Sequence, residues 1–241
     1  MLTSKELKGY AHQRKLKTLD QAWKDYIQDQ VLYLLYSRSP SLVFRGGTSI
    51  WKVLKGNRFS EDLDLCKGKE ELQNLEDYLG KELELRGFEV DIKKDRETDN
   101  MLFIKLGVSS PARHRETTVP VEILKTKEIE ETKEYELHSP YPDIPLFNVK
   151  LPSLQELVKD KLSAVQGRNR ARDLHDLYFL LKHGATINPE EAKEINIEEF
   201  KEKMMEKKNQ WSSLESLITG KLPSFKKETK YIEKKLKKAK E

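Results

Sequence analysis

The chain has 241 residues, of which 37% are hydrophobic and 36% charged, and its formal net charge is +4. This length allows one large or two small domains with a buried core, and the composition excludes global disorder, a fibre and a repeat array. The longest apolar runs, such as residues 31–36, fall far short of the roughly 20 residues of a transmembrane helix. The first 20 residues lack the apolar centre of a secretory signal, and the single cysteine, Cys66, fits a reducing compartment, so we expect a cytoplasmic protein.

The charge is distributed unevenly along the chain. Residues 221–241 contain nine lysines and three glutamates, a net charge of +6, so the rest of the chain sums to −2. A lysine-rich segment attracts phosphate-bearing polymers by releasing their counterions. Helices rich in lysine and glutamate are also commonly just solvated, and the tail taken alone favours that interpretation.

The hydrophobic pattern of the first half mixes helices and strands. In chain order we predict helix 18–37, strand 41–45, a tight turn at Gly46 and Gly47, helix 48–54, strand 59–66, a helix through Leu72 and Leu83, and strands 88–93, 101–108 and 119–125. The polar segment 109–118 predicts a hairpin loop between the last two strands.

Prolines at positions 140, 142, 145 and 152 punctuate the chain before a second half that is helical throughout. The predicted helices there are 153–166, 171–183, 196–208, 211–219 and 224–240. The sequence therefore predicts an α+β protein with a first domain over residues 1–150 and a helical second domain, which carries the basic tail, over residues 151–241.

The first candidate site residues, Gly46, Gly47, Thr48 and Ser49, lie where a predicted strand runs into a helix. Glycines let the backbone approach a ligand closely because they lack a Cβ. Backbone amides at the start of the following helix favour an anion. We interpret these four residues as a candidate phosphate site; the alternative is that the turn needs glycine only for its own conformation.

Asp62 and Asp64 are two residues apart on a predicted strand, so both carboxylates project from one face while Leu63 and Leu65 point into the core. Two such oxygen ligands can hold Mg²⁺ or Mn²⁺ against the phosphates of a nucleotide. A surface strand also places charged residues on its solvated face. The glycine turn just upstream favours the metal interpretation, because both features belong to one strand, turn, helix and strand unit.

Two separated segments resemble the AbiEii/AbiGii-like nucleotidyltransferase toxins. The first reads Gly-Gly-Thr at 46–48 and Arg-Phe-Ser-Glu-Asp-Leu-Asp-Leu at 58–65, and it resembles the first signature of that family. The second consists of Lys161 and the segment 170–181, and it resembles the family's later lysine and its Arg-Asp-Leu-Tyr-Asp-Leu-type helix. The resemblance implies a polymerase-β-like nucleotidyltransferase core with a mixed sheet, followed by a helical lobe.

The resemblance also implies a role for each matched position. Residues 46–49 would hold the triphosphate of an NTP, Asp62 and Asp64 would bind Mg²⁺, and Lys161 would reach the phosphates from the helical lobe. Asp173 and Asp176 both match the family's later acid, and they share one helix face, so the choice between them stays open. The alternative for each is a structural pair with Arg170 or Arg172.

Two further positions have two interpretations each. Glu122 on the predicted strand 119–125 is the best candidate for the third catalytic carboxylate that the superfamily implies, and a solvent-facing glutamate on a buried strand is equally consistent with the sequence. Arg58 would contact the γ-phosphate or pair with a nearby acidic residue. Arg45, Ile50 and His175 depart mildly from the residues usual in the family.

The resemblance implies an Mg²⁺-dependent enzyme that moves an NMP from an NTP to an acceptor, an RNA hydroxyl such as a tRNA 3′ end, as the toxin of a pair with an antitoxin protein. The alternatives are transfer to a small molecule or to protein, and a catalytically silent nucleotide- or RNA-binding module. If the basic tail contributes to RNA binding, deletion of residues 224–241 weakens RNA affinity and spares NTP binding.

Overall fold

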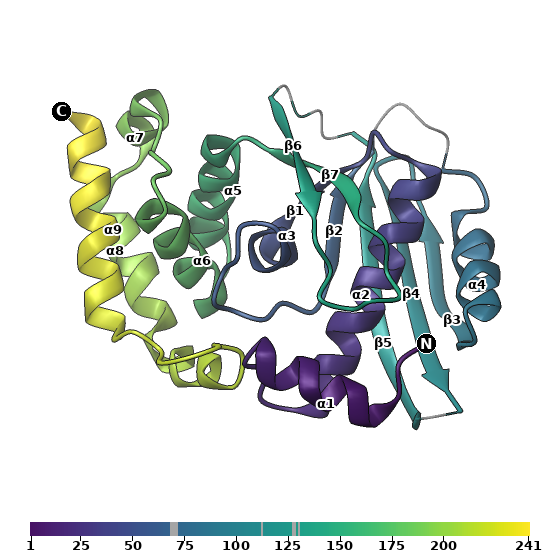
Figure 1. Ribbon diagram of the computed structural model, residues 1–241. Coiled ribbons are helices and arrows are strands. Elements are labelled where there is room, and N and C mark those ends of the chain that lie inside the picture. Colours follow the sequence, from purple (N-terminus) through teal and green to yellow (C-terminus); the bar gives the residue numbers. More distant parts are fainter. Residues whose placement is uncertain (68–71, 112, 127–128, 130) are drawn as a thin grey trace. The chain divides into compact units, whose positions relative to one another are not determined.

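The computed structural model describes residues 1–67, 72–111, 113–126, 129 and 131–241, and the chain forms two compact units (Figure 1). The first unit comprises Met1–Lys55 and Phe59–Leu151, and the second comprises Gly56–Arg58 and Pro152–Glu241. The short segment Gly56–Arg58 thus belongs to the second unit, although both of its neighbours along the chain belong to the first.

The first unit is built on a mixed sheet. Its strands, within the described ranges, are β1 (Val43–Arg45), β2 (Leu63–Cys66), β3 (Glu89–Glu97), β4 (Met101–Ser110), β5 (Arg113–Leu124), β6 (Thr132–Leu137) and β7 (Phe147–Pro152). They follow the order β3-β4-β5-β2-β1-β7-β6. β2 pairs antiparallel with β1 and parallel with β5, whereas β3, β4 and β5 pair antiparallel in succession. The predicted α+β class with a mixed sheet is therefore confirmed.

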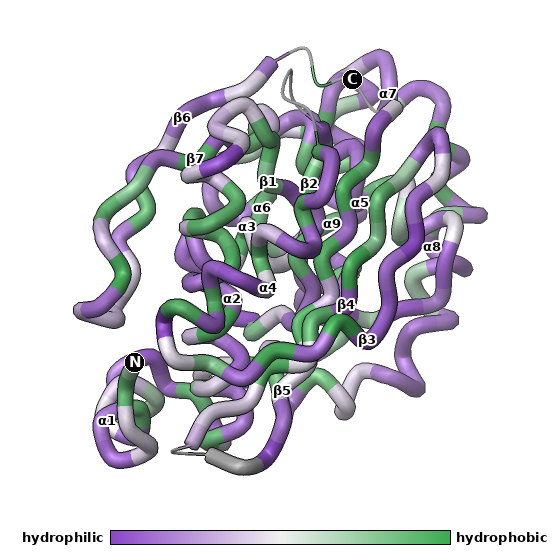
Figure 2. The backbone as a smooth tube through the Cα atoms, turned by 90° about the vertical axis from the view of Figure 1, so that its right-hand side faces the viewer, coloured by the Kyte–Doolittle hydropathy of each residue, from purple (hydrophilic) through white to green (hydrophobic). Residues whose placement is uncertain are grey.

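The hydrophobic core of the first unit lies between this sheet and two of its helices. The helices of the unit are α1 (Ser4–Gln13), α2 (Leu19–Arg38), α3 (Gly46–Lys52) and α4 (Leu75–Leu85). α2 packs against β5 and α4, and α4 packs against β3, so both helices lie on one face of the sheet. Figure 2 shows hydrophobic residues along the central strands and a largely hydrophilic β6. Each fully buried leucine or valine in this layer contributes about 1.5–3 kcal/mol to folding.

The hairpin predicted between the last two strands is present, but its loop is much shorter than the predicted 109–118. β4 continues to Ser110 and β5 begins at Arg113, and the pairs Val108↔Thr117 and Ser110↔Arg113 extend the ladder into the described part of this segment. The side chains there are polar, but the backbone ladder forms regardless of side-chain polarity, and threonine is well suited to a strand. The polar composition of this segment therefore predicted a longer loop than the structure has.

Three local predictions also need correction. No separate turn precedes α3, because the helix begins at Gly46 directly after β1. The strand predicted at 59–66 shortens to β2 (Leu63–Cys66). The helix predicted at 211–219 is replaced by the short 3₁₀ helix η2 (Ser212–Ser216), which follows a second 3₁₀ helix, η1 (Lys207–Gln210). Helix α1, which was not predicted, begins with a capping box in which the Thr3 side chain and Glu6 satisfy each other's backbone amides.

The second unit is helical. It contains α5 (Leu154–Gly167), α6 (Ala171–Lys182), α7 (Pro189–Glu194), α8 (Ile197–Glu206), η1, η2 and α9 (Phe225–Lys240). The basic tail forms α9, which packs against α6, α7 and α8 and buries Glu228, Ile232 and Leu236. The tail is thus part of the core of this unit. Over the described residues, no helix has the length and apolar character needed to cross a membrane.

Candidate active site

In the first unit the strand–helix–strand segment β1–α3–β2 brings Gly46 against Asp64. Gly46 has a φ of +74°, a conformation that side-chain-bearing residues rarely adopt, and a Cβ placed on it would lie 2.0 Å from Asp64 Oδ2. Only glycine fits here, because any side chain would displace the carboxylate. The backbone of α3 therefore begins directly beside one of the predicted metal ligands.

The hydroxyls of Thr48 and Ser49 are used inside this segment. Ser49 Oγ donates to the Gly46 carbonyl oxygen at 2.9 Å, and Thr48 Oγ1 donates to the carbonyl oxygen of Asp62. Both side chains are fully buried. These contacts tie the first turn of α3 to the residue that precedes β2.

The predicted alternation along β2 is present. Leu63 and Leu65 are fully buried, whereas Asp64 is half-buried, as is Asp62, which lies just before the strand and not on it as predicted. Glu122 on β5 lies at the register of Asp64 in the parallel pair, so both side chains leave the same face of the sheet. The structure thus places Glu122 at the position beside Asp64 on the neighbouring strand. The sequence alone could not establish that these two residues are neighbours.

In the second unit a buried ion-pair network joins the residues of the second motif. Arg58 Nε and Nη2 donate to Asp176 Oδ1 and Oδ2 at 2.8 and 2.9 Å, and Lys161 Nζ lies 2.8 Å from Asp176 Oδ2. Lys161 also contacts Asp173 Oδ1 at 3.3 Å. Asp173 in turn accepts two hydrogen bonds from Arg168, at 2.7 and 2.8 Å.

The electrostatics of this network keep both aspartates ionised. Burial opposes ionisation of Asp176, but Arg58 and Lys161 outweigh it and hold its pKa well below the ordinary range. For Asp173, burial is outweighed in the same way by Arg168 and Lys161, which lower its pKa. Both aspartates are therefore carboxylates that hold the Lys161 ammonium.

The sequence offers Arg170 or Arg172 as alternative pairing partners of these aspartates; the structure shows Lys161, Arg58 and Arg168 bound to the two carboxylates. For Arg58 the sequence left open a phosphate contact or a pair with a nearby acid. The structure shows an ion pair, and the partner is 118 residues away in the chain.

Three further residues of this unit, which the sequence does not assign to the site, form a chain of hydrogen bonds that ends beside Arg58 in the sequence. His175 Nδ1 lies 2.8 Å from Glu228 Oε1, and His175 Nε2 lies 2.9 Å from Asn57 Oδ1. Burial raises the pKa of Glu228 more than the adjacent His175 lowers it. These contacts anchor Asn57, the residue before Arg58, and no local pattern in the sequence announces them.

Comparison with known proteins decides the family. A family model described as the nucleotidyl transferase AbiEii toxin of a type IV toxin–antitoxin system matches residues 31–237. The chain belongs to the AbiEii family. It is accordingly a nucleotidyltransferase of the toxin class, and membership implies an NTP substrate, a divalent metal ion and an antitoxin partner.

Solved structures share the fold of this AbiEii protein at low sequence identity. JHP933 from Helicobacter pylori is 18% identical, and the match covers 93% of each chain with a TM-score of 0.59. MenT4, a nucleotidyltransferase toxin from Mycobacterium tuberculosis H37Rv, is 21% identical over 92% of this chain and 76% of that one, with a TM-score of 0.54. No curated sequence matches this chain.

The donor set of the AbiEii chain fits a divalent metal ion. Carboxylate oxygens are the ligands that Mg²⁺ and Mn²⁺ prefer, and the absence of a Cβ at Gly46 lets the Asp64 carboxylate lie directly against the start of α3. Within the described ranges no three His, Cys, Asp or Glu side chains are grouped to hold a metal. A metal held here would therefore depend on Asp62 and Asp64 and complete its coordination with phosphate oxygens and water.

Proposed function

We propose that this AbiEii protein transfers an NMP from an NTP to an RNA hydroxyl, such as a tRNA 3′ end, with Mg²⁺ bound by Asp62 and Asp64. The observation that carries this proposal is the seat of the Asp64 carboxylate against Gly46, with Glu122 at the same register on β5. This arrangement combines a close backbone approach with two neighbouring carboxylates.

We assign a residue or a backbone segment to each step of the reaction. The acceptor oxygen attacks the α-phosphorus, the bond from that phosphorus to the bridging oxygen breaks, and pyrophosphate leaves. Glu122 is the proposed acceptor of the hydroxyl proton, and the backbone of residues 46–49 orients the triphosphate. When bound, the metal would supply positive charge to the phosphate oxygens.

The residues of the second unit are proposed to act through Lys161. Its ammonium would offset the charge that develops on the phosphates. Asp173 and Asp176 hold that ammonium from two sides, at 3.3 and 2.8 Å, so we assign them a role in orienting it. Asp176 is the better candidate for the functional acid, because it makes the shorter contact to Lys161 and also holds Arg58.

The test measures transfer of α-labelled ATP, GTP, CTP and UTP, each offered separately, to total tRNA. Wild type should label the tRNA with at least one nucleotide, and Asp64→Asn should lose nearly all of that activity. Asp91→Asn, the same change on an exposed side chain of β3, should label like wild type. Equal labelling by wild type and Asp64→Asn would contradict the mechanism.

The acceptor is decided by competition. If RNA is the acceptor, excess tRNA should suppress labelling of any other acceptor in the reaction. If a small molecule or a protein is the acceptor, it should keep its label when excess tRNA is added. A protein that binds NTP but releases no pyrophosphate with any acceptor would overturn the proposal in favour of a silent binding module.

A further inference from the structure

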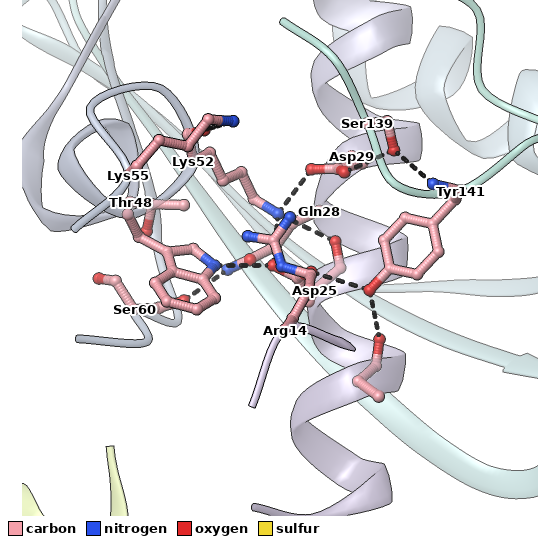
Figure 3. Close-up of polar contacts among 12 residues, drawn as sticks. Arg14, Asp25, Gln28, Asp29, Thr48, Lys52, Lys55, Ser60, Ser139 and Tyr141 are labelled. Atoms are coloured by element: carbon pink, nitrogen blue, oxygen red, sulfur yellow. Dashed lines mark hydrogen bonds and ion pairs between the residues drawn. The ribbon is translucent and has the colours of Figure 1, made fainter. Parts of the chain in front are cut away.

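A buried polar network connects α2 to α3 in the first unit (Figure 3). Its charged members are Arg14, Asp25, Asp29 and Lys52, and the exposed fraction of each side chain is 17%, 0%, 1% and 1%. Three of these four residues, Arg14, Asp25 and Asp29, precede the region matched by the AbiEii family model, which begins at residue 31. The network is therefore a feature of this chain that the family match does not describe.

Asp25 is the centre of the network because its two carboxylate oxygens serve different elements. Oδ1 accepts from Trp51 Nε1 and from Lys52 Nζ, both at 2.8 Å, and these are the last two residues of α3. Oδ2 accepts from the Tyr141 hydroxyl at 2.8 Å and lies 3.2 Å from Arg14 Nε. One buried side chain of α2 thus holds the end of α3.

Lys52 is held on the other side as well. Its ammonium donates to the backbone oxygen of Asp25 at 3.0 Å and lies 2.6 Å from Asp29 Oδ1. Two cations and two carboxylates balance each other among these four residues, and Lys55, which donates to the Lys52 carbonyl oxygen, adds a further cation beside them. Burial opposes ionisation of Asp25, but Lys52 and Arg14 outweigh it and lower its pKa to about 2.

A second side chain of α2 reaches the segment that leads to the metal ligands. Gln28 Nε2 donates to the carbonyl oxygen of Ser60 at 3.1 Å, and Thr48 of α3 donates to the carbonyl oxygen of Asp62. Helix α2 therefore holds two neighbours of the proposed site: α3, whose first residue lies against Asp64, and the stretch just before Asp62.

We propose that Asp25 is a positioning residue, which fixes α3 against α2 and thereby sets the relation of Gly46 to Asp64 and of Thr48 to Asp62. This proposal rests on the proposed function, because it assigns a purpose to the geometry of the carboxylates. It extends the proposed site by a residue that touches no substrate and lies outside the matched region.

The experiment compares two aspartate-to-asparagine changes in the full-length chain. Asp25→Asn removes the charge that holds Trp51 and Lys52. Asp143→Asn is the matched control, because the side-chain hydrogen bonds of Asp143 within the described residues join it to Tyr26 and Gln30 of the same helix and not to α3. Two readouts apply, both at a temperature where each variant is folded: amide hydrogen exchange across residues 46–52, and Mn²⁺ affinity measured by electron paramagnetic resonance.

The expected result is faster exchange across residues 46–52 in Asp25→Asn than in Asp143→Asn, and a Mn²⁺ affinity lowered by about 10- to 100-fold, the usual effect of losing a residue that orients metal ligands. In nucleotide transfer, kcat should fall in Asp25→Asn while Asp143→Asn keeps the wild-type value. Equal exchange and equal Mn²⁺ affinity in both variants would overturn the proposal.

Trp51→Phe decides the question if Asp25→Asn fails to fold. It removes the hydrogen bond to Asp25 Oδ1 without leaving a buried charge unpaired, and the ring keeps its packing against Phe59. Faster exchange across residues 46–49 in this variant supports the positioning role, and unchanged exchange contradicts it. If wild type transfers no nucleotide and binds no Mn²⁺, the proposed function fails; the exchange measurement still tests the link from Asp25 to α3.

Discussion

Arg58 and Asp176 stand 118 residues apart in the sequence and form a two-point ion pair in the second unit, with donor–acceptor distances of 2.8 and 2.9 Å. Both side chains are buried, with exposed fractions of 4% and 3%. The pair fixes the short segment Gly56–Arg58, which ends just before the stretch leading to Asp62 and Asp64. A motif residue that sequence alone could assign to a phosphate is thus part of the internal framework of the helical unit.

Replacement of Arg58 by alanine should strongly destabilise the second unit. Removal of one partner of a buried ion pair leaves the other charge uncompensated, which costs about 3–5 kcal/mol. Denaturation in urea, followed by circular dichroism, measures the loss. The exposed pair Lys193 and Glu190 provides the control, since Lys193→Ala should cost well under about 1 kcal/mol. Similar losses in the two variants would show that the Arg58 pair contributes little.

Gly46→Ala should impair the proposed site more than the fold. The added Cβ meets Asp64 Oδ2 at 2.0 Å, and the φ of +74° costs an alanine about 1–2 kcal/mol. We expect Mn²⁺ affinity and nucleotide transfer to fall by at least about 10-fold, because the carboxylate must move. Gly9→Ala, in α1 with open space around its Cα, should instead raise stability by about 0.5–1 kcal/mol and leave Mn²⁺ affinity unchanged.

Acid should erase the stabilisation that Asp25 provides. Its pKa in the folded protein is about 2, below the ordinary value of 3.8, so its contribution is fully present above pH 4 and disappears as the pH falls towards 2. The difference in unfolding free energy between wild type and Asp25→Asn should therefore be constant from pH 7 to about pH 5 and shrink between pH 4 and pH 2. A difference that stays constant down to pH 2 would mean that Asp25 does not hold its charge through these pairs.

The basic tail requires a different test from deletion. Removing residues 224–241 would strip Ile232 and Leu236 from the core, at about 1.5–3 kcal/mol each, so we expect the truncated second unit to unfold. Loss of RNA binding by that truncation would then report unfolding rather than a lost contact.

Substitution of exposed lysines of α9 isolates their charge. The variant Lys226→Gln, Lys230→Gln, Lys234→Gln should bind RNA more weakly and reduce the slope of log affinity against log salt by about 2, since each single-strand phosphate contact contributes about 0.7. The control neutralises the exposed lysines Lys5, Lys8 and Lys17 at the other end of the chain. If both triple variants bind alike, α9 is only a solvated helix.

The sequence determined the parts of this protein that depend on local patterns. The alternation of Leu63 and Leu65 with aspartates predicted the buried and solvated sides of β2, and a glycine at position 46 marked the strained backbone beside Asp64. Helical spacing of apolar residues predicted most helices. These features are readable because side chains in a strand or a helix return to the same face at fixed intervals along the sequence.

Tertiary structure determined which charged and polar side chains pair with each other. Arg58 with Asp176, His175 with Glu228, and Asp25 with Lys52 join residues that are 118, 53 and 27 positions apart. Which carboxylate a buried cation meets depends on how whole elements pack, and no spacing along the chain encodes it. The same holds for Glu122, which reaches the register of Asp64 only because β2 and β5 pair in parallel. The sequence thus determined which residues carry the chemistry, and packing determined which of them hold the others in place.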